Sequence, residues 1–231
     1  IWRKGYPWLV ENIVGCQGME HLQKKPDNGA GTIFLVLHHG SWEAIGIWLA
    51  QLGPMTSLYE PAKHPALDSW VKSSRHRSGM SLAPTNVRGV AQLLKSLKRG
   101  DNVVILPDQS PRLSGGAFSV LFGVPALTMT LTHNLIQRTG CQVLFVAAVR
   151  VKGGFEIVLQ SALDAIYSAD QQSSLLALNA GVESIVALAP SQYQWTYKRF
   201  RIQLDQAGEP YDAANVLYPK TFHNYVIIHD S

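Results

Sequence analysis

The sequence predicts an α/β domain with a mostly parallel, mixed β-sheet flanked by helices. Three observations lead to this prediction. Apolar runs of strand length alternate with stretches of helical period along the chain. The runs TIFLVL (32–37) and NVVILPD (102–108) are the kind found in strands covered on both faces. No Gly/Ser-rich or Pro-rich linker divides the 231 residues, so we expect one domain over residues 1–231.

The first half of the chain gives the clearer local patterns. Residues 41–53 are predicted as a helix because Ser41 can cap its start and Gly53 can end it. The stretch after Asn86 repeats apolar residues at helical spacing, and Gly100 ends it. We therefore expect strands over 32–37, 55–60, 80–84 and 102–108, and helices over 41–53, 64–79 and 87–100.

The second half is predicted to add two helices around a pair of strands. Residues 127–140 read as a helix, and residues 168–190 as a longer one with Ser168 or Asp170 near its cap. Between them, 141–151 and 153–160 read as adjacent strands joined through two glycines.

Composition excludes a disordered protein. Apolar residues make up 46% and charged residues 16% of the chain, as in a folded protein, and the formal charge is only +4. Local basic clusters suit an anionic partner such as phosphate, an acidic protein or lipid headgroups, or they are solvated helix faces.

Cys16 and Cys141 lie in apolar surroundings and are predicted as buried thiols. The sequence contains no GxSxG, GxxxxGK[ST], GxGxxG or HExxH motif.

The stretch VLHHGSWEAIG (36–46) carries the most chemistry. It places His38 and His39 after an apolar strand, with Glu43 five residues beyond the first histidine. One interpretation is a helix start with incidental polar residues. A second is a metal site formed by one histidine, Glu43 and a third ligand such as Asp108 or His64. A third is a general base, His38, oriented by the Glu43 carboxylate.

Position in the sheet favours a site here. His38 and Asp108 both follow predicted strands, and ligands of parallel sheets bind at the carboxyl ends of the strands. The sequence offers no serine or cysteine in a recognised nucleophile motif. A histidine base would therefore activate a substrate hydroxyl directly.

Three motifs carry a resemblance to a known family. HHGSWE (38–43) has H-x4-E spacing and resembles the HxGNWE motif of late acyltransferases of lipid A biosynthesis, within the glycerolipid acyltransferase superfamily. Residues 105–130 resemble the family's PDQ segment with its F-x-x-x-F-G-x-P-A continuation. Residues 189–201 are similar to its P-E-Q-Y-x-W-x-x-K-R-F segment. The three follow in the family's order, from His38 to Arg201.

The resemblance implies a glycerolipid acyltransferase-like fold and the transfer of an acyl chain from a thioester to a hydroxyl of a lipid A precursor. His38 would be the base and Glu43 its orienting carboxylate, although His39 stands four residues before Glu43 and competes with His38 for the role. Arg75 and Asp108 would line the site.

Two further arginines are substrate-binding candidates on the same resemblance. Arg77 replaces Arg75 if the alignment shifts, and Arg112 is a phosphate-binding candidate in the altered stretch DQSPRLSGG.

Partners follow from the same family. The expected donor is acyl carrier protein or acyl-CoA and the acceptor a glycolipid at a membrane surface, with no nucleic acid, metal or cofactor besides the acyl thioester. We expect the cytoplasmic face of the bacterial inner membrane, with peripheral binding or an N-terminal anchor missing before Ile1. Alternative acceptors are another glycolipid, an aminolipid or a lysophospholipid, and a non-catalytic lipid-binding protein would keep the same fold.

Overall fold

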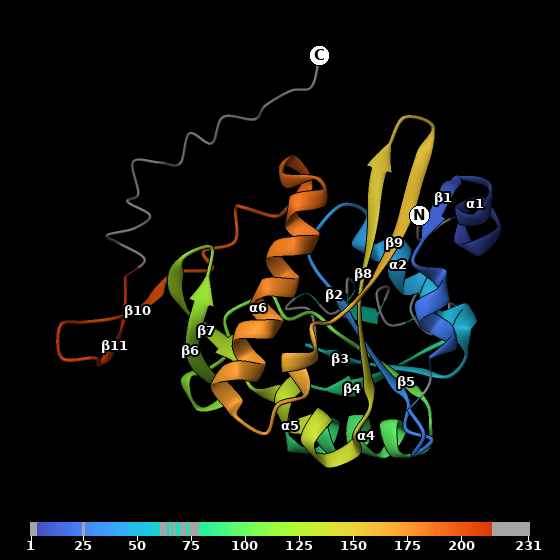
Figure 1. Ribbon diagram of the computed structural model, residues 1–231. Coiled ribbons are helices and arrows are strands. Elements are labelled where there is room, and N and C mark those ends of the chain that lie inside the picture. The colour runs from blue at the N-terminus through green and yellow to red at the C-terminus, as the bar shows by residue number, and fades with distance from the viewer. Residues whose placement is uncertain are drawn as a thin grey trace.

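The computed structural model describes residues 4–24, 26–60, 64, 66, 68, 69, 73 and 79–213. Within these residues the main sheet has seven strands in the order β1-β9-β8-β2-β5-β3-β4 (Figure 1). Its strands are β1 (Ile13–Gln17), β2 (Thr32–Val36), β3 (Met55–Tyr59), β4 (Met80–Pro84), β5 (Asn102–Ile105), β8 (Gln142–Val151) and β9 (Gly154–Ser161). The neighbours from β8 to β4 run parallel and β9 runs antiparallel to β8, which confirms the mixed, mostly parallel sheet.

Helices cover both faces of this sheet (Figure 1). The α-helices are α1 (Gly5–Glu11), α2 (Trp42–Leu49), α4 (Val87–Lys98), α5 (Leu131–Thr139) and α6 (Gln171–Leu188). Short 3₁₀ turns are η1 (Met19–Gln23), η2 (Ala50–Leu52), η3 (Leu113–Gly115), η4 (Asp164–Tyr167) and η5 (Pro190–Gln192). Buried residues of α1 and α2 share one core, and those of α4, α5 and α6 share the other.

Strand β2 separates the two cores by simple alternation, because successive side chains of a strand point to opposite faces. Ile33 and Leu35 belong to the core under α4, α5 and α6. Phe34 and Val36 belong to the core under α2. All five residues of β2 are buried, as the continuous apolar run predicts.

The chain order brings the ends of β2 and β5 together. From β2 the chain passes through α2 to β3 and on to β4, and α4 then returns it to β5, which lies between β2 and β3. After β5 the chain crosses to β8 on the other side of β2. The strand order thus changes direction at β2 and β5, where ligands bind in open α/β sheets.

The structure corrects the prediction between β5 and α5. A hairpin of β6 (Gly116–Leu121) and β7 (Val124–Met129) forms there, which was not predicted from the sequence. Residues 127–129, predicted as helix, pair with β6 instead, and α5 begins only after Thr130. The predicted helix over 64–79 falls mostly outside the described residues. A second hairpin, β10 (Ile202–Leu204) with β11 (Pro210–Asp212), follows the α6 region.

The cysteine prediction is half right. Cys141 is buried, and burial raises the pKa of its thiol to about 11. Cys16 is exposed and lies on β1, an edge strand of the sheet that pairs only with β9 among the described strands.

Helix α6 approaches the sheet through Gly181. A Cβ at this position would lie 2.2 Å from the Phe145 ring, and Phe145 is only 1% exposed. We expect Gly181→Ala to lower the free energy of unfolding by about 1–3 kcal/mol because the buried ring cannot move aside. This loss exceeds the gain in helix propensity, which is at most about 1 kcal/mol.

Urea unfolding of both variants checks the packing. The matched control is Gly46→Ala in α2, whose Cβ would meet Met80 Cε at an ordinary 3.5 Å. The control is expected to match or exceed the stability of the wild type. Equal stability of Gly181→Ala and the wild type would show that α6 does not pack as described.

Candidate active site

His38 follows β2 at the carboxyl edge of the sheet. Alternation continues past the strand, so its ring lies on the α2 side, with its centroid 5.1 Å from that of Trp42. The chain turns sharply at Gly40, whose φ is +58°, and a Cβ there would lie 2.2 Å from the Ala148 carbonyl oxygen. The backbone N–H of Ser41 donates to that same carbonyl, which fixes the loop against β8.

Asp108 holds the imidazole of His38 from the neighbouring strand. His38 Nδ1 lies 3.0 Å from Asp108 Oδ1, and the backbone N–H of His38 donates to Oδ2 at 2.9 Å. The Asp108 side chain is 2% exposed and that of His38 is 15% exposed. A buried carboxylate on Nδ1 favours the tautomer that carries its proton there, which leaves Nε2 with the lone pair that accepts a hydrogen bond or a proton.

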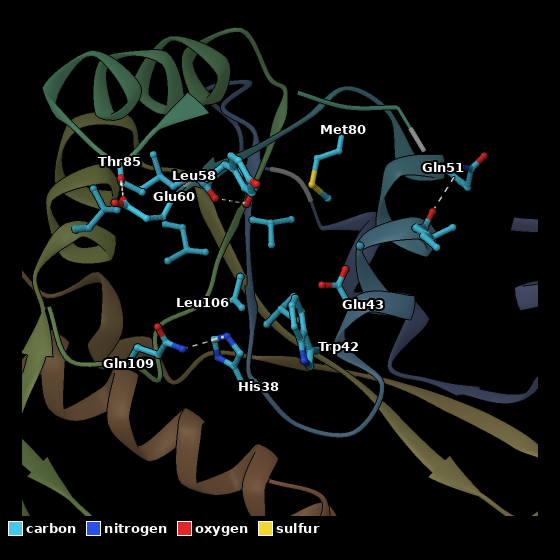
Figure 2. Close-up of a pocket in the computed structure, with 18 of the residues that line it drawn as sticks. His38, Trp42, Glu43, Gln51, Leu58, Glu60, Met80, Thr85, Leu106 and Gln109 are labelled. Carbon is cyan, nitrogen blue, oxygen red and sulfur yellow. Dashed lines mark hydrogen bonds between the residues drawn. The ribbon is translucent and has the colours of Figure 1, made fainter. Parts of the chain in front are cut away.

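The other ring nitrogen faces Gln109. The amide nitrogen of Gln109 lies 3.3 Å from His38 Nε2, at the edge of the pocket shown in Figure 2. This glutamine belongs to the PDQ motif, and no role was predicted for it from the sequence. Its position next to Asp108 was the available signal, because the residue after an orienting carboxylate stays near the same ring.

Glu43 lies in the first turn of α2 and lines the same pocket, with its carboxylate directed into the cavity (Figure 2). The H-x4-E spacing predicts that Glu43 orients His38. In the structure Asp108 takes the place on Nδ1, and both ring nitrogens of His38 face groups other than Glu43. The described contacts of the His38 ring nitrogens are thus with Asp108 and Gln109, and Glu43 lines the pocket beside them.

His39 points to the opposite side of the sheet. It is 1% exposed, and its Nε2–H donates to the Ala189 carbonyl oxygen at 2.9 Å. Burial lowers the pKa of His39, against the raising effect of this hydrogen bond. His38 lines the pocket and His39 does not, so His38 is the imidazole that faces it. Among the described residues no three His, Cys, Asp or Glu side chains lie close enough to hold a metal ion.

The pocket beside His38 is a cavity of about 630 Å³ between α2 and the strands β2, β5, β3 and β4. His38 and Gln109 lie toward one end in Figure 2, and Met80 and Thr85 lie toward the other. Its apolar lining includes Val36, Ile47, Leu58, Met80, Val104, Ile105, Leu106, Met129 and Leu131. Such a lining suits an apolar ligand whose reactive group is placed at the histidine end.

Of the three predicted arginines, Arg112 alone lies within the described part of the chain. Arg75 and Arg77 lie outside the described residues. Arg112 is exposed at the start of η3, in the loop after Asp108, and it does not line the pocket.

A histidine in contact with a buried carboxylate thus lines one end of an apolar cavity, an arrangement that is chemically able to act as a general base. Residues 7–202 match the family described as bacterial lipid A biosynthesis acyltransferase, and the chain belongs to that family. This match confirms the resemblance found in the sequence.

Individual relatives are similar at modest identity. A lipid A biosynthesis acyltransferase of Haemophilus influenzae is 28% identical over 81% of this chain and 59% of its own length. In Escherichia coli K12, a lipid A biosynthesis palmitoleoyltransferase is 26% identical over 83% of this chain and 63% of its own length. A lauroyltransferase of the same organism is 27% identical over 80% and 60%. The chain thus spans between 59% and 63% of the length of these curated relatives. No helix within the described part of the chain combines the length and apolar character needed to cross a bilayer.

Proposed function

We propose that this protein moves a fatty acyl chain from an acyl thioester on acyl carrier protein to a hydroxyl of a lipid A precursor, at the cytoplasmic face of a bacterial inner membrane. The contact between His38 and Asp108 beside the apolar cavity carries the proposal. The relatives include acyltransferases of lipid A biosynthesis, and this supports the choice of acceptor.

In the proposed reaction His38 acts as a general base through Nε2. It takes the proton of the acceptor hydroxyl while the hydroxyl oxygen attacks the thioester carbonyl carbon. Asp108 stabilises the imidazolium that forms. When the C–S bond breaks, the proton passes from His38 to the departing sulfur, and the base is restored.

Gln109 is placed to stabilise the tetrahedral intermediate. Its amide nitrogen lies 3.3 Å from His38 Nε2, so an oxyanion formed next to the attacking hydroxyl falls within its reach. Glu43, on the pocket wall, is assigned to the polar groups of the substrate. The two carboxylates therefore have different roles: Asp108 orients His38, and Glu43 contacts the substrate.

Turnover with defined substrates tests the function. The purified protein is incubated with a lipid A precursor and an acyl thioester, and the products are measured by mass spectrometry. A product heavier by one acyl group is expected, with a higher rate from acyl carrier protein than from acyl-CoA. Transfer only to another glycolipid, an aminolipid or a lysophospholipid would show that the acceptor is not a lipid A precursor. Binding of lipid without transfer to any acceptor would refute the catalytic role.

The acyl chain is proposed to occupy the cavity along α2, which makes Gly46 a determinant of chain length. Gly46 lines the pocket on the side of Met80. Gly46→Leu would fill part of the cavity and is expected to lower kcat/KM for the longest accepted chain by at least about tenfold relative to shorter chains. The measurement is a series of acyl thioesters of increasing length.

Gly46→Ala is the control for this series, because a single Cβ meets Met80 at ordinary contact distance and should leave the profile nearly unchanged. A chain-length profile that Gly46→Leu does not alter would place the acyl chain elsewhere.

A further inference from the structure

The segment from Ala189 to Arg199 crosses the carboxyl edge of the sheet and holds the loop that carries His38. The backbone N–H of Gln194 donates to the His38 carbonyl at 3.0 Å, and the N–H of Gly40 donates to the Gln192 carbonyl at 3.0 Å. His39 and Tyr193 form an isolated antiparallel bridge. No residue of this segment lines the pocket, so the chemistry proposed above leaves it without a role.

The same segment holds the loop that carries Asp108 and Gln109. The backbone N–H of Ser110 donates to the Tyr197 hydroxyl oxygen at 3.0 Å. The Ser110 hydroxyl donates to the Arg199 carbonyl at 2.9 Å. The Arg199 side chain is buried and donates to the Leu127 carbonyl at 2.8 Å, which ties the segment to β7 as well.

Tyr193 connects the segment to the carboxylate itself. It is buried, and burial is the largest cause that raises the pKa of its hydroxyl. The negative charge of Asp108 raises this pKa further, while the positive charge of Arg199 lowers it. The Tyr193 phenol, the Asp108 carboxylate and the Arg199 guanidinium therefore lie close enough to interact electrostatically.

Gln109 is thus fixed from both sides. Asp108 before it is held by His38, and Ser110 after it is held by Tyr197 and Arg199. We propose that Tyr197 is a positioning residue: its hydroxyl fixes Ser110 so that Asp108 and Gln109 face the two ring nitrogens of His38. This inference rests on the proposed function of the site for its kinetic consequences.

Tyr197→Phe removes one hydroxyl and leaves the ring. It is expected to lower kcat about tenfold with KM within about twofold of the wild type, because small displacements of catalytic groups cost rate more than binding. The matched control is Tyr167→Phe. The Tyr167 hydroxyl also accepts a backbone N–H, that of Val143 at 3.1 Å, at the start of β8 and the opposite edge of the sheet. Both variants lose one equivalent hydrogen bond, so a similar fall in Tm is expected, with kcat unchanged in the control.

A second readout does not need turnover. In protein labelled with ¹⁵N-histidine, the ring resonances of His38, assigned by their loss in His38→Ala, report its tautomer. Wild type and Tyr167→Phe are expected to show the proton on Nδ1, and Tyr197→Phe a shift toward a mixture of tautomers. If Tyr197→Phe does not fold, Ser110→Ala, which loses the bond to the Arg199 carbonyl, is expected to give the same results.

The outcomes separate the two proposals. Absence of transfer by the wild type with every acceptor refutes the proposed function, and the His38 resonances then still decide the positioning role. An unchanged tautomer in Tyr197→Phe, a kcat equal to that of Tyr167→Phe, or a change confined to KM overturns the positioning role.

Discussion

His38→Ala is expected to lower acyl transfer by about 10²–10⁴-fold, because it removes the group that accepts the proton of the attacking hydroxyl. The fold should survive. The His38 side chain is small and partly exposed, and the Asp108 carboxylate keeps the hydrogen bond from the backbone N–H of residue 38. The rate is measured by mass spectrometry of the acylated product, and the fold by circular dichroism and thermal unfolding.

His21→Ala is the matched control for this experiment. His21 contacts the Ser161 hydroxyl at 3.0 Å, away from the pocket, and its loss should not affect the rate. A folded His38→Ala protein with full activity would rule out the general-base mechanism.

Asp108→Asn is expected to cost on the order of 10²–10⁴-fold in kcat, as loss of the orienting carboxylate does in histidine-based triads. The neutral amide cannot stabilise an imidazolium. Its NH₂ group can also donate to Nδ1, which would move the ring proton to Nε2 and block the base. The shape of the side chain is kept, so substrate binding and KM should change little.

Glu43→Gln provides the comparison that separates the two carboxylates. Since Glu43 faces the cavity rather than Nδ1, its substitution should act mainly on KM and cost less in kcat than Asp108→Asn. A larger loss of kcat in Glu43→Gln would restore the orienting role that the H-x4-E spacing suggested. Both variants are measured with one acyl thioester and one lipid A precursor, across a range of acceptor concentrations.

Much of the fold follows from local sequence. Strands β2, β3, β4, β5, β8 and β9 lie where apolar runs predicted them, and α2, α4 and α6 follow the predicted helical stretches. Asp170 caps α6 through the backbone N–H of Ser173. These features depend on local residue preferences and on the period of apolar residues, which is two residues in a strand and 3.6 in a helix. Both can be read from the sequence without knowing the fold.

The hairpin of β6 and β7 shows where local patterns fail. The helical spacing of apolar residues in α5 can be extended back to Leu127, so residues 127–129 look helical from the sequence. Only their pairing with β6 makes them a strand. Cys16 shows the same limit, because its apolar neighbours do not reveal that β1 is an edge strand. Both errors concern partners that are distant in the sequence.

For the site, the sequence by itself predicted that His38 and Asp108 fall at the carboxyl ends of buried strands, and it left open whether His38 or His39 is the base. Only the tertiary structure decided which carboxylate meets the imidazole. Glu43 is five residues from His38 and Asp108 is seventy, yet the return of β5 to lie beside β2 brings Asp108 to Nδ1. Spacing along the sequence determines which way side chains point within one helix or strand. Contact between the ends of two strands depends on which strands pair, and pairing is set by the packing of the whole sheet.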